Sequence, residues 1–207
     1  MAREPRISAI LLAAGLSKRL GRNKLLLPAG GIPVVRRAAL ALAESRAAEV
    51  IAVVGHEAAA VAAALEGLRL RVVHNPGYAQ GQSTSLRTGL AQAAPDAEGF
   101  LFALGDQPLL TAEWVDRLIG AFTSAPGSIL GAALYHGGRR GNPVLLSASL
   151  REELARVEGD EGARKILRRL EQEERLLAVP AEEADLFLDL DTEADHARLL
   201  EKYAGRE

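Results

Sequence analysis

The sequence predicts an α/β fold built on a doubly wound, mostly parallel sheet. Short apolar runs of strand length alternate with helix-type stretches through the first two thirds of the chain, and glycine or polar residues follow the early apolar runs. Alternation of this kind is typical of βαβ units. The 207 residues are 48% apolar, which suits one domain with a sizeable core, and no linker divides them. We therefore expect a single domain over residues 1–207.

The first half of the chain has the pattern of four strands separated by helices. Runs rich in Val, Ile and Leu predict buried strands at residues 7–12, 50–54, 70–74 and 99–104. Helix-type spacing of apolar residues predicts helices at 34–48, at 58–65 and from about 81 to 94. The segment Asn75-Pro76-Gly77 is a turn signal that closes the third strand.

The second half mixes helices with shorter strands. Thr111 is a candidate N-cap for a helix whose apolar face carries Trp114, Val115, Leu118, Ile119 and Phe122. Further helices are expected at 150–157, at 163–174 and from 191 to about 203. Strands are expected at 128–135, 144–146, 176–179 and 187–190, with a loop over 137–143, GGRRGNP.

Composition excludes several classes of function. The formal net charge is only -2, so no overall field recruits nucleic acid. The absence of cysteine excludes disulfides, thiolate zinc sites and a cysteine nucleophile. The histidines lack metal-ligand spacing, and no Ser-His-Asp pattern indicates a hydrolase. The amino terminus has no apolar signal region and the apolar runs are strand-sized, so we expect a cytoplasmic protein without a membrane partner.

The stretch at residues 7–24, ISAILLAAGLSKRLGRNK, carries the clearest chemical pattern. Its apolar run leads into three residues with almost no side chain, Ala13, Ala14 and Gly15, where backbone N–H groups can approach a ligand closely. Four cations that can neutralise phosphates follow, Lys18, Arg19, Arg22 and Lys24. The pattern predicts an anion site at the carboxyl end of the first strand, where open α/β sheets bind ligands. A tight turn with a solvated basic loop is the simpler alternative.

Asp106 is the sharpest single candidate for a metal ligand. It follows the apolar strand at 99–104 directly, so we expect it at a carboxyl end facing the crevice. A carboxylate there can hold Mg²⁺ against phosphate oxygens, because Mg²⁺ is usually bound by one or two carboxylates plus phosphates. With Lys24 upstream we favour this role over a simple turn cap.

Asp191 is a candidate second metal ligand. If residues 187–190 form a strand, Asp189 and Asp191 point to one face because the side-chain period is two. The alternative is that Asp191 and Glu193 are acidic residues at the start of the last helix.

Three other polar segments have both a structural and a functional interpretation. Gly81, Ser83 and Ser85 open a helix that can contact a nucleobase or a phosphate, or that is merely capped by a hydroxyl. Arg140 and Asn142 lie on a predicted loop that can close on a phosphate, or that is only solvated. The segment GDEGAR at 159–164 we interpret as a helix–helix connection, with Asp160 as a cap.

The motifs together resemble one family over nearly the whole chain. In order, they are LLAAGLSKRLGRNKLLLPAGGIPVV, VVGHEA, VHNPGYAQGQSTSLRTGL, LGDQPLLT, RRGNPVLL, GDEGAR and LDLDTEAD. This set resembles the nucleotidyltransferases that include the molybdenum cofactor cytidylyltransferases and guanylyltransferases. The cytidylyltransferase branch is more similar, because the guanylyl branch more often has a glycine at the position of Ala14. The resemblance would lead us to expect methionine at the position of Leu20. Leucine and methionine have similar side-chain volumes, so this difference should matter little.

The resemblance implies a Rossmann-like nucleotidyltransferase fold and a Mg²⁺-dependent transfer of CMP from CTP to the phosphate of a molybdopterin-type acceptor, with release of pyrophosphate. Residues 1–110 would bind the nucleotide, and residues 111–207 would bind the acceptor and close the site. The resemblance also implies roles for matching residues. Base and ribose would contact Leu12, Ala13, Ala14 and Gly15, with Ser85 near the base. Arg19 and Lys24 would hold the triphosphate, Asp106 would bind Mg²⁺ with Asp191 as a possible second ligand, and Arg140 and Asn142 would face the acceptor.

Three alternatives stay open at this point. The nucleotide can be GTP, or the acceptor can be another phosphorylated small molecule, since base and acceptor choice depend on a few contacts. The protein can also be a non-catalytic chaperone that binds the cofactor and hands it to a recipient molybdoenzyme. Asp106 separates the last alternative from an enzyme, because a chaperone has no need of a catalytic metal.

Overall fold

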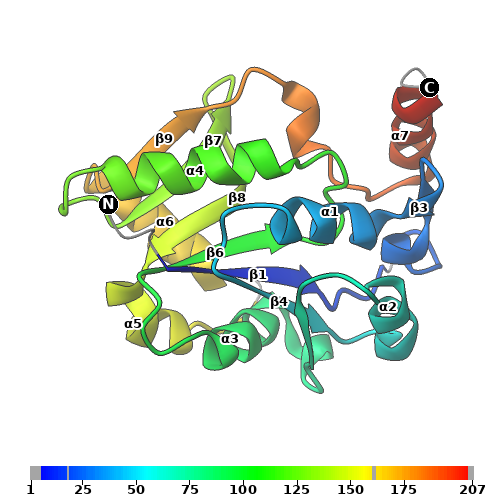
Figure 1. Cartoon of the computed structure of the whole chain (residues 1–207), viewed down its shortest axis with the longest axis horizontal. Helices are drawn as coiled ribbons and strands as arrows, with labels where there is room; N and C mark the ends of the chain where they lie inside the picture. The colour runs from blue at the N-terminus through cyan, green and yellow to red at the C-terminus, as the bar shows by residue number, and fades with distance from the viewer. Residues whose placement is uncertain (1–5, 18, 160–161, 205–207) are drawn as a thin grey trace.

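The fold is seen in a computed structural model, which describes residues 6–17, 19–159 and 162–204 (Figure 1). Within these residues the main sheet has seven strands in the order β5-β4-β1-β6-β8-β7-β9. Their bounds are β1 (Ile7–Ala13), β4 (Glu49–Val54), β5 (Arg71–His74), β6 (Gly99–Leu104), β7 (Gly131–His136), β8 (Arg139–Ser147) and β9 (Leu176–Pro180). Neighbours pair in parallel except at β8, which runs antiparallel to both β6 and β7. The predicted doubly wound, mostly parallel α/β fold is confirmed.

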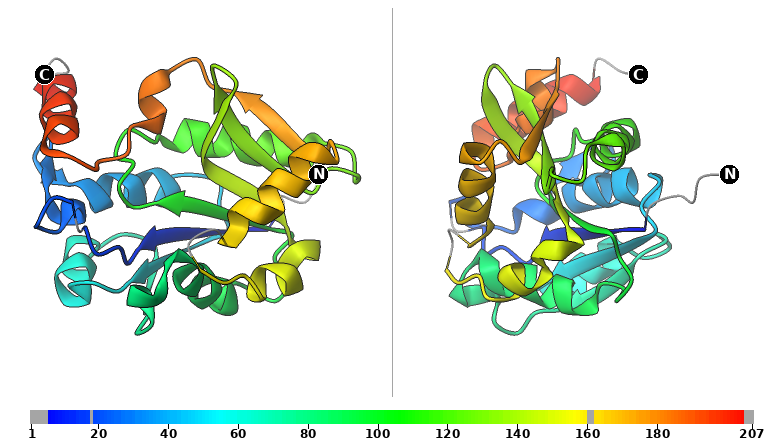
Figure 2. Two further views of the ribbon diagram at one scale, coloured as in Figure 1. Left: turned by 180° about the vertical axis from the view of Figure 1, so that it is seen from behind. Right: turned by 90° about the vertical axis from the view of Figure 1, so that its left-hand side faces the viewer.

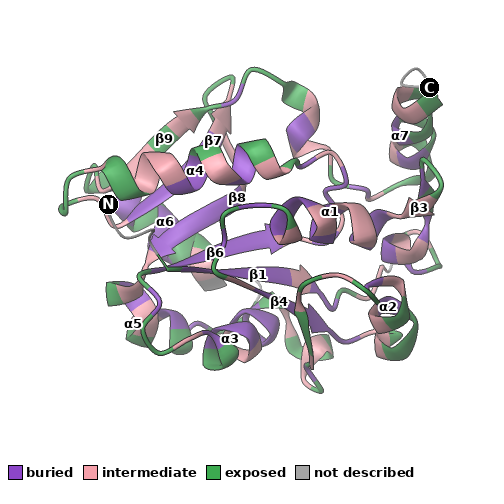
Figure 3. Cartoon of the chain, in the orientation of Figure 1, coloured by how far each residue is buried: buried purple, intermediate pink, exposed green. Residues whose placement is uncertain are grey.

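Helices cover both faces of the sheet, as the right-hand view in Figure 2 shows. One apolar core lies between the sheet and α1 (Val34–Ala43), α2 (Ala58–Ala64) and α4 (Ala112–Ser124). A second core lies between the sheet and α3 (Gln82–Gln92), α5 (Arg151–Ala155) and α6 (Gly162–Gln172). The central strands between these cores are buried almost throughout (Figure 3). This double burial is why their sequences are continuous apolar runs.

The chain reverses its direction of winding between β1 and β6. From β1 it passes to β4 and β5 on one side, then returns through α3 to β6 on the other side of β1. Such a reversal leaves a crevice beyond the carboxyl ends of the two strands, where open α/β sheets bind ligands. Gly89 lets α3 lie close to this point, since a Cβ there would sit 2.4 Å from a methyl of Ile10.

A small third cluster ties the last described helix to the segment that follows the cationic loop at residues 14–24. The hairpin of β2 (Pro28–Ala29) and β3 (Ile32–Pro33) packs against α7 (Glu193–Ala204), as Figure 1 shows on the right. Leu190 and Leu199 are fully buried in this cluster. The Nε2 atom of His196 lies 2.8 Å from the carbonyl oxygen of Pro28. These contacts carry the acidic segment before α7 across the end of the sheet.

Two predicted elements are wrong. Residues 139–143 form the start of β8 and not a loop, because β7 and β8 make a hairpin in which His136 pairs with Arg139 across the two-residue turn Gly137-Gly138. Both glycines have positive φ, 55° and 76°, as a tight hairpin turn requires. Residues 187–190 are not a strand. Phe187 ends a short 3-10 helix, η4 (Ala184–Phe187), and residues 188–190 follow it without regular structure. The N–H of Leu190 donates to the backbone oxygen of Asp106 instead of to a neighbouring strand.

The other elements agree with prediction apart from their ends. The first helix stops at Ala43 instead of 48, because Ser45 closes the turn with a hydroxyl bond to the carbonyl oxygen of Leu42. The helix after Thr111 begins as expected, although the Thr111 side chain makes no cap bond. Lys18, Asp160 and Glu161 lie outside the described residues.

Candidate functional site

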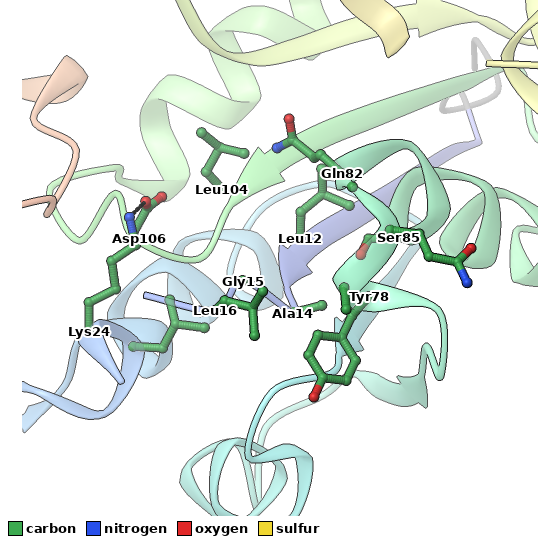
Figure 4. Close-up of a pocket in the computed structure, with 14 residues that line it drawn as sticks. Leu12, Ala14, Gly15, Leu16, Lys24, Tyr78, Gln82, Ser85, Leu104 and Asp106 are labelled. Atoms are coloured by element: carbon green, nitrogen blue, oxygen red, sulfur yellow. Dashed lines mark ion pairs between the residues drawn. The ribbon is translucent and has the colours of Figure 1, made fainter. Parts of the chain in front are cut away.

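A cavity of about 460 Å³ opens beyond the carboxyl ends of β1 and β6, at the reversal point of the fold. Figure 4 shows Lys24 and Asp106 at one end of it and Tyr78 and Ser85 at the other. The polar ends and the small residues between them suit an elongated ligand with one anionic end. The lining residues are Leu12, Ala14, Gly15, Leu16, Lys24, Leu25, Tyr78, Ala79, Gln80, Gly81, Gln82, Ser85, Leu104 and Asp106.

The wall at the Tyr78 end is closely packed. A Cβ built on Gly55 would lie 2.6 Å from the Cβ of Tyr78 and 2.8 Å from the Cβ of Ala14. Only glycine fits between them, so the Ala14 methyl and the Tyr78 ring converge at this end of the cavity. Tyr78 comes from a short 3-10 helix, η2 (Tyr78–Gln80), and its ring also lies near His56, with 6.3 Å between centroids.

Local hydrogen bonds at the end of the cationic loop at residues 14–24 place the Lys24 side chain in the cavity. The Oδ1 atom of Asn23 accepts from the N–H of Leu25 and caps the 3-10 helix η1 (Lys24–Leu26). The N–H of Lys24 donates to the hydroxyl of Ser17 at 3.1 Å, and Ser17 has a φ of 50°. The loop therefore closes on itself and fixes the backbone at Lys24.

The Lys24 ammonium lies between two carboxylates. Its Nζ atom is 2.5 Å from Asp106 Oδ2 and 2.8 Å from Asp191 Oδ1. Burial lowers the pKa of Lys24, but attraction to Asp106 and hydrogen bonds to both carboxylates outweigh it, so the pKa lies above its usual 10.5. Arg19, which is largely exposed, adds a bond of 2.5 Å to Asp191. The cations of the loop thus meet anions of the segment before α7.

A third carboxylate, that of Asp189, lies close enough to Asp106 to respond to its charge. Its pKa is raised, first by desolvation and then by repulsion from Asp106, even though the residue retains substantial solvent exposure. The Gln107 amide donates to Asp189 Oδ1 at 2.7 Å, and this hydrogen bond partly offsets the rise in the pKa of Asp189. The pKa of Asp191 is lowered instead, chiefly by its hydrogen bond from Lys24. Negative charge is therefore in excess around Asp106.

A chain of side-chain bonds fixes Ser85 at the other end of the cavity. The N–H of Gly77 donates to Asn75 Oδ1, so the Asn75 amide nitrogen points toward α3. This nitrogen donates to the hydroxyl oxygens of Thr84 at 2.9 Å and Ser85 at 3.0 Å. The Ser85 oxygen accepts from this amide, and its hydroxyl proton can be donated to a ligand in the cavity.

A second, smaller cavity of about 120 Å³ adjoins the first and shares Leu12, Gln82 and Leu104 with it. It lies between α3, β6, β8 and the first turn of α6. Its remaining lining residues are Ser83, Leu86, Phe102, Asn142, Val144, Ala163, Arg164 and Leu167. Asn142 therefore faces a cavity next to the main one.

The Arg140 side chain lines neither cavity. It shares the Asn142 face of β8, and its guanidinium bonds Glu171 of α6 at 2.5 Å. The Tyr135 hydroxyl of β7 donates to the same carboxylate oxygen. Desolvation raises the pKa of Glu171, but the bonds from Tyr135 and Arg140 outweigh it, so the pKa lies below its usual range.

The structure thus brings most of the predicted residues together. Seven of them line the main cavity, Leu12, Ala14, Gly15, Lys24, Gly81, Ser85 and Asp106, while Ala13 is buried in the core beside Gly105. Sequence reasoning missed Tyr78, Gln82 and Arg164. The turn signal at 75–77 concealed the first, because it suggested a connection where the buried Asn75 in fact organises a cavity wall.

The Lys24 ammonium marks where a cation fits. Two carboxylates of separate segments already converge on that ammonium, and the raised pKa of Asp189 indicates negative charge that a divalent ion would relieve. Among the described residues no group of three or more Asp, Glu or His side chains could enclose a metal by itself. Two carboxylates completed by phosphate and water oxygens are the arrangement typical of Mg²⁺.

Comparison with known proteins identifies the family. Residues 9–175 match the MobA-like NTP transferase domain. The chain belongs to this family. The predicted family is thereby confirmed, and with it nucleotidyltransferase chemistry at the level of the family. Separately, none of the described helices is both long enough and apolar enough to span a bilayer.

Two curated relatives of this MobA-like chain differ in their named activities. It is 39% identical over 171 residues to nicotine blue oxidoreductase of Paenarthrobacter nicotinovorans, covering 79% of this chain and 82% of that one. It is 28% identical over 198 residues to the molybdenum cofactor cytidylyltransferase of Escherichia coli K12, covering 95% and 97%.

Two solved structures share the whole fold of this chain. A nucleotidyl transferase from Methanothermobacter superimposes with a TM-score of 0.84 at 28% identity, over 98% of this chain and 99% of that one. Rv0371c of Mycobacterium tuberculosis H37Rv, in a complex with manganese, superimposes with a TM-score of 0.73 at 30% identity, over 95% and 98%.

Proposed function

We propose that this MobA-like protein transfers CMP from CTP to the phosphate of a molybdopterin-type acceptor and releases pyrophosphate. The observation that carries the proposal is the Lys24 ammonium held between Asp106 and Asp191 at the anionic end of the cavity. A cation and two carboxylates at one point are what a metal-bound triphosphate requires. The cytidylyltransferase relative of nearly equal length supports the choice of reaction.

In this proposal the ion pairs of the free protein are exchanged when nucleotide binds. Arg19 and Lys24 turn to the triphosphate oxygens, and Asp106 and Asp191 become ligands of Mg²⁺. The metal, when bound, neutralises phosphate charge and orients the α-phosphate. The manganese complex of the similar structure Rv0371c supports the proposal of a divalent metal. Lys24 stays charged throughout the neutral range, because its pKa is raised.

The other end of the cavity holds the base and ribose. Leu12, Ala14 and Gly15 form the floor below them, whereas Ala13 is buried in the core. The Ser85 hydroxyl donates to an acceptor atom of the base. The Ala14 methyl and the Tyr78 ring pack together around Gly55 at this end. We expect the space beside them to accept a pyrimidine more readily than a purine. Cytosine also presents ring and carbonyl acceptors to a donor such as Ser85.

No side-chain nucleophile is needed for the transfer. The acceptor phosphate is already an anion, so an oxygen of it attacks the α-phosphorus directly while the bond to pyrophosphate breaks. Catalysis consists of positioning and charge neutralisation. Residues 1–110 hold the nucleotide, and residues 111–207 contribute Asn142 to the acceptor, while Arg140 stays bonded to Glu171.

The test measures pyrophosphate release and nucleotide binding with purified protein. Calorimetry with Mg²⁺ compares CTP with GTP for the wild type and for Asp106→Ala, and turnover is followed with molybdenum-loaded molybdopterin. We expect CTP to bind more tightly, the variant to bind it weakly, and pyrophosphate to appear only with acceptor. Preference for GTP would replace the cytidylyl proposal with the guanylyl one.

Two further outcomes identify other functions. Binding of CTP or acceptor without pyrophosphate release would favour a chaperone that delivers cofactor to a recipient molybdoenzyme. Because the 39% identical relative is an oxidoreductase, the same preparations are also assayed for oxidation of NADH and NADPH. Turnover of a reduced nicotinamide without pyrophosphate would refute nucleotidyl transfer.

A further inference from the structure

We infer that the second cavity receives the body of the acceptor, a flat ring system with a polar edge and an anionic substituent. The inference rests on the proposed function. It starts from position, because the second cavity shares Leu12, Gln82 and Leu104 with the nucleotide cavity. A molecule seated in it lies beside a bound nucleotide, as in-line attack by its phosphate requires.

The second cavity has buried apolar walls and polar side chains nearer the solvent. Leu86, Phe102, Val144 and Leu167 come from four different elements and are each at least 95% buried, yet a space of about 120 Å³ remains between them. Sites that enclose a whole ligand usually measure about 300–1,000 Å³. This cavity therefore suits one part of a ligand, and apolar walls favour the faces of a ring.

The polar groups at the edge define the chemistry of that ring. The Asn142 amide offers a donor and an acceptor, which matches the edge of a heterocycle carrying both. Arg164, exposed in the first turn of α6, offers a planar cation for a carboxylate, phosphate or other anion. Its backbone also lies near the positive end of the α6 dipole.

Ala163 and Arg164, the last two residues of the GDEGAR segment, thereby gain a binding role, although the sequence suggested that the segment is only a connection. Ala163 is the informative position within it, because its small side chain lines the cavity while packing against the second core. A larger side chain at 163 would fill the space without touching the Lys24 end of the nucleotide cavity.

The experiment pairs each variant with a matched control on the same side of the molecule. Ala163→Leu fills the cavity, whereas Ala155→Leu makes the same change at an exposed position of α5. Arg164→Gln removes the edge cation, whereas Lys165→Gln removes a cation from the exposed neighbouring residue. The probes are 6-hydroxymethylpterin monophosphate, followed by its fluorescence, and CTP with Mg²⁺, followed by calorimetry.

We expect Ala163→Leu to weaken binding of the pterin phosphate at least about 10-fold and to leave the Kd of CTP within about 2-fold. Arg164→Gln should weaken it about 5-fold, and both controls should match the wild type. In turnover with molybdenum-loaded molybdopterin the same variants should raise the KM of the acceptor and not that of CTP.

The outcomes separate the two proposals. Suppose that the wild type releases no pyrophosphate but binds the pterin phosphate, and that Ala163→Leu weakens this binding. The proposed reaction is then refuted, and the assignment of the second cavity as the binding site of the ring is supported. Equal binding by Ala163→Leu and Ala155→Leu would overturn the cavity assignment even in an active enzyme. Failure of the wild type to bind the pterin phosphate at all would overturn it as well.

Discussion

Lys24 and Arg140 are both cations held by carboxylates at the same end of the sheet, but their surroundings differ. Lys24 lies inside the main cavity, and its partners Asp106 and Asp191 come from the end of β6 and the segment before α7. Arg140 lies outside both cavities, where Glu171 joins β8 to α6. An ion pair inside a cavity can be exchanged for ligand charges, whereas a pair between packed elements chiefly holds those elements together.

The surroundings of a cation, and not its residue type alone, determine its role. Arg140 has the planar fork that suits a phosphate, yet Tyr135 and Glu171 already fix it on the face of β8. Lys24 is a point charge whose carboxylate neighbours can themselves move to a metal. We therefore expect substitutions at the cavity pair to affect turnover most, and those at the second pair to affect stability most.

The largest expected effect is that of Asp106→Asn. Loss of this carboxylate removes the principal proposed metal ligand and one partner of Lys24, so turnover should fall about 1,000-fold or more. The fold should persist, since asparagine has the same shape. Initial rates of pyrophosphate release and a circular dichroism melt measure the two effects. Asp96→Asn, in an exposed pair with Arg6, is the matched control and should keep full activity.

The next effect is that of Lys24→Met, which keeps the unbranched apolar stem of the side chain and removes its charged end. We expect turnover to fall about 100-fold to 1,000-fold, because no ammonium remains to stabilise charge on the triphosphate. Stopped assays over a range of Mg²⁺·CTP concentrations separate kcat from KM. Arg22→Met removes a loop cation that pairs with Glu193 instead, and it should change kcat by less than about 3-fold. Equal losses in both variants would contradict the distinction between the two cations.

Arg140→Gln tests the second ion pair. It removes the bond from β8 to Glu171, so the free energy of unfolding should fall by about 1 kcal/mol, or Tm by about 2–4 °C. The KM of CTP should not change. Differential scanning calorimetry measures the shift. Arg156→Gln, which breaks an exposed pair with Glu152 on a helix surface, should leave Tm within about 1 °C. An unchanged Tm with a raised acceptor KM would show instead that Arg140 contacts the acceptor.

The sequence predicts the sheet better than it predicts the segments that close the site. β1 and β6 are evident because strands buried on both faces are unbroken apolar runs, and their ends locate Lys24 and Asp106. The start of β8 was missed although Gly137-Gly138 is a hairpin signal, because Arg-Arg-Gly-Asn-Pro has the composition of a loop. Pairing with β7 overrides that local preference.

Asp189 and Asp191 lie near Asp106, as expected, although the strand predicted to carry them does not form. The strand expected at 187–190 is absent from the described fold, yet both carboxylates reach the surroundings of Asp106. What brings them there is burial of Leu190 with Leu199 near the hairpin of β2 and β3. Contacts between residues so distant in sequence leave no periodic signal, so they could not be predicted from spacing.

The smallest expected effects concern stability at Asp189 and Asp191, and they have opposite signs. The pKa of Asp189 is raised in the folded protein, so folding binds protons between its unfolded value of about 3.9 and the folded value, and stability falls as pH rises through that window. Asp189→Asn removes this cost and can keep the bond from Gln107. It should be more stable than the wild type at about pH 7 by a few tenths of a kcal/mol, and equal to it below about pH 3.

For Asp191 the pKa is lowered, so its contribution to stability is present above about pH 3.9 and is lost as pH falls through the folded value. Asp191→Asn should therefore be less stable at neutral pH and approach the wild type in acid. Denaturant titrations from about pH 3 to pH 7 measure both differences. Curves that diverge from the wild type in opposite directions as pH rises would establish that Lys24 stabilises one carboxylate and leaves its neighbour uncompensated. That uncompensated charge is what a divalent cation at Asp106 would neutralise, so added Mg²⁺·CTP should reduce the advantage of Asp189→Asn.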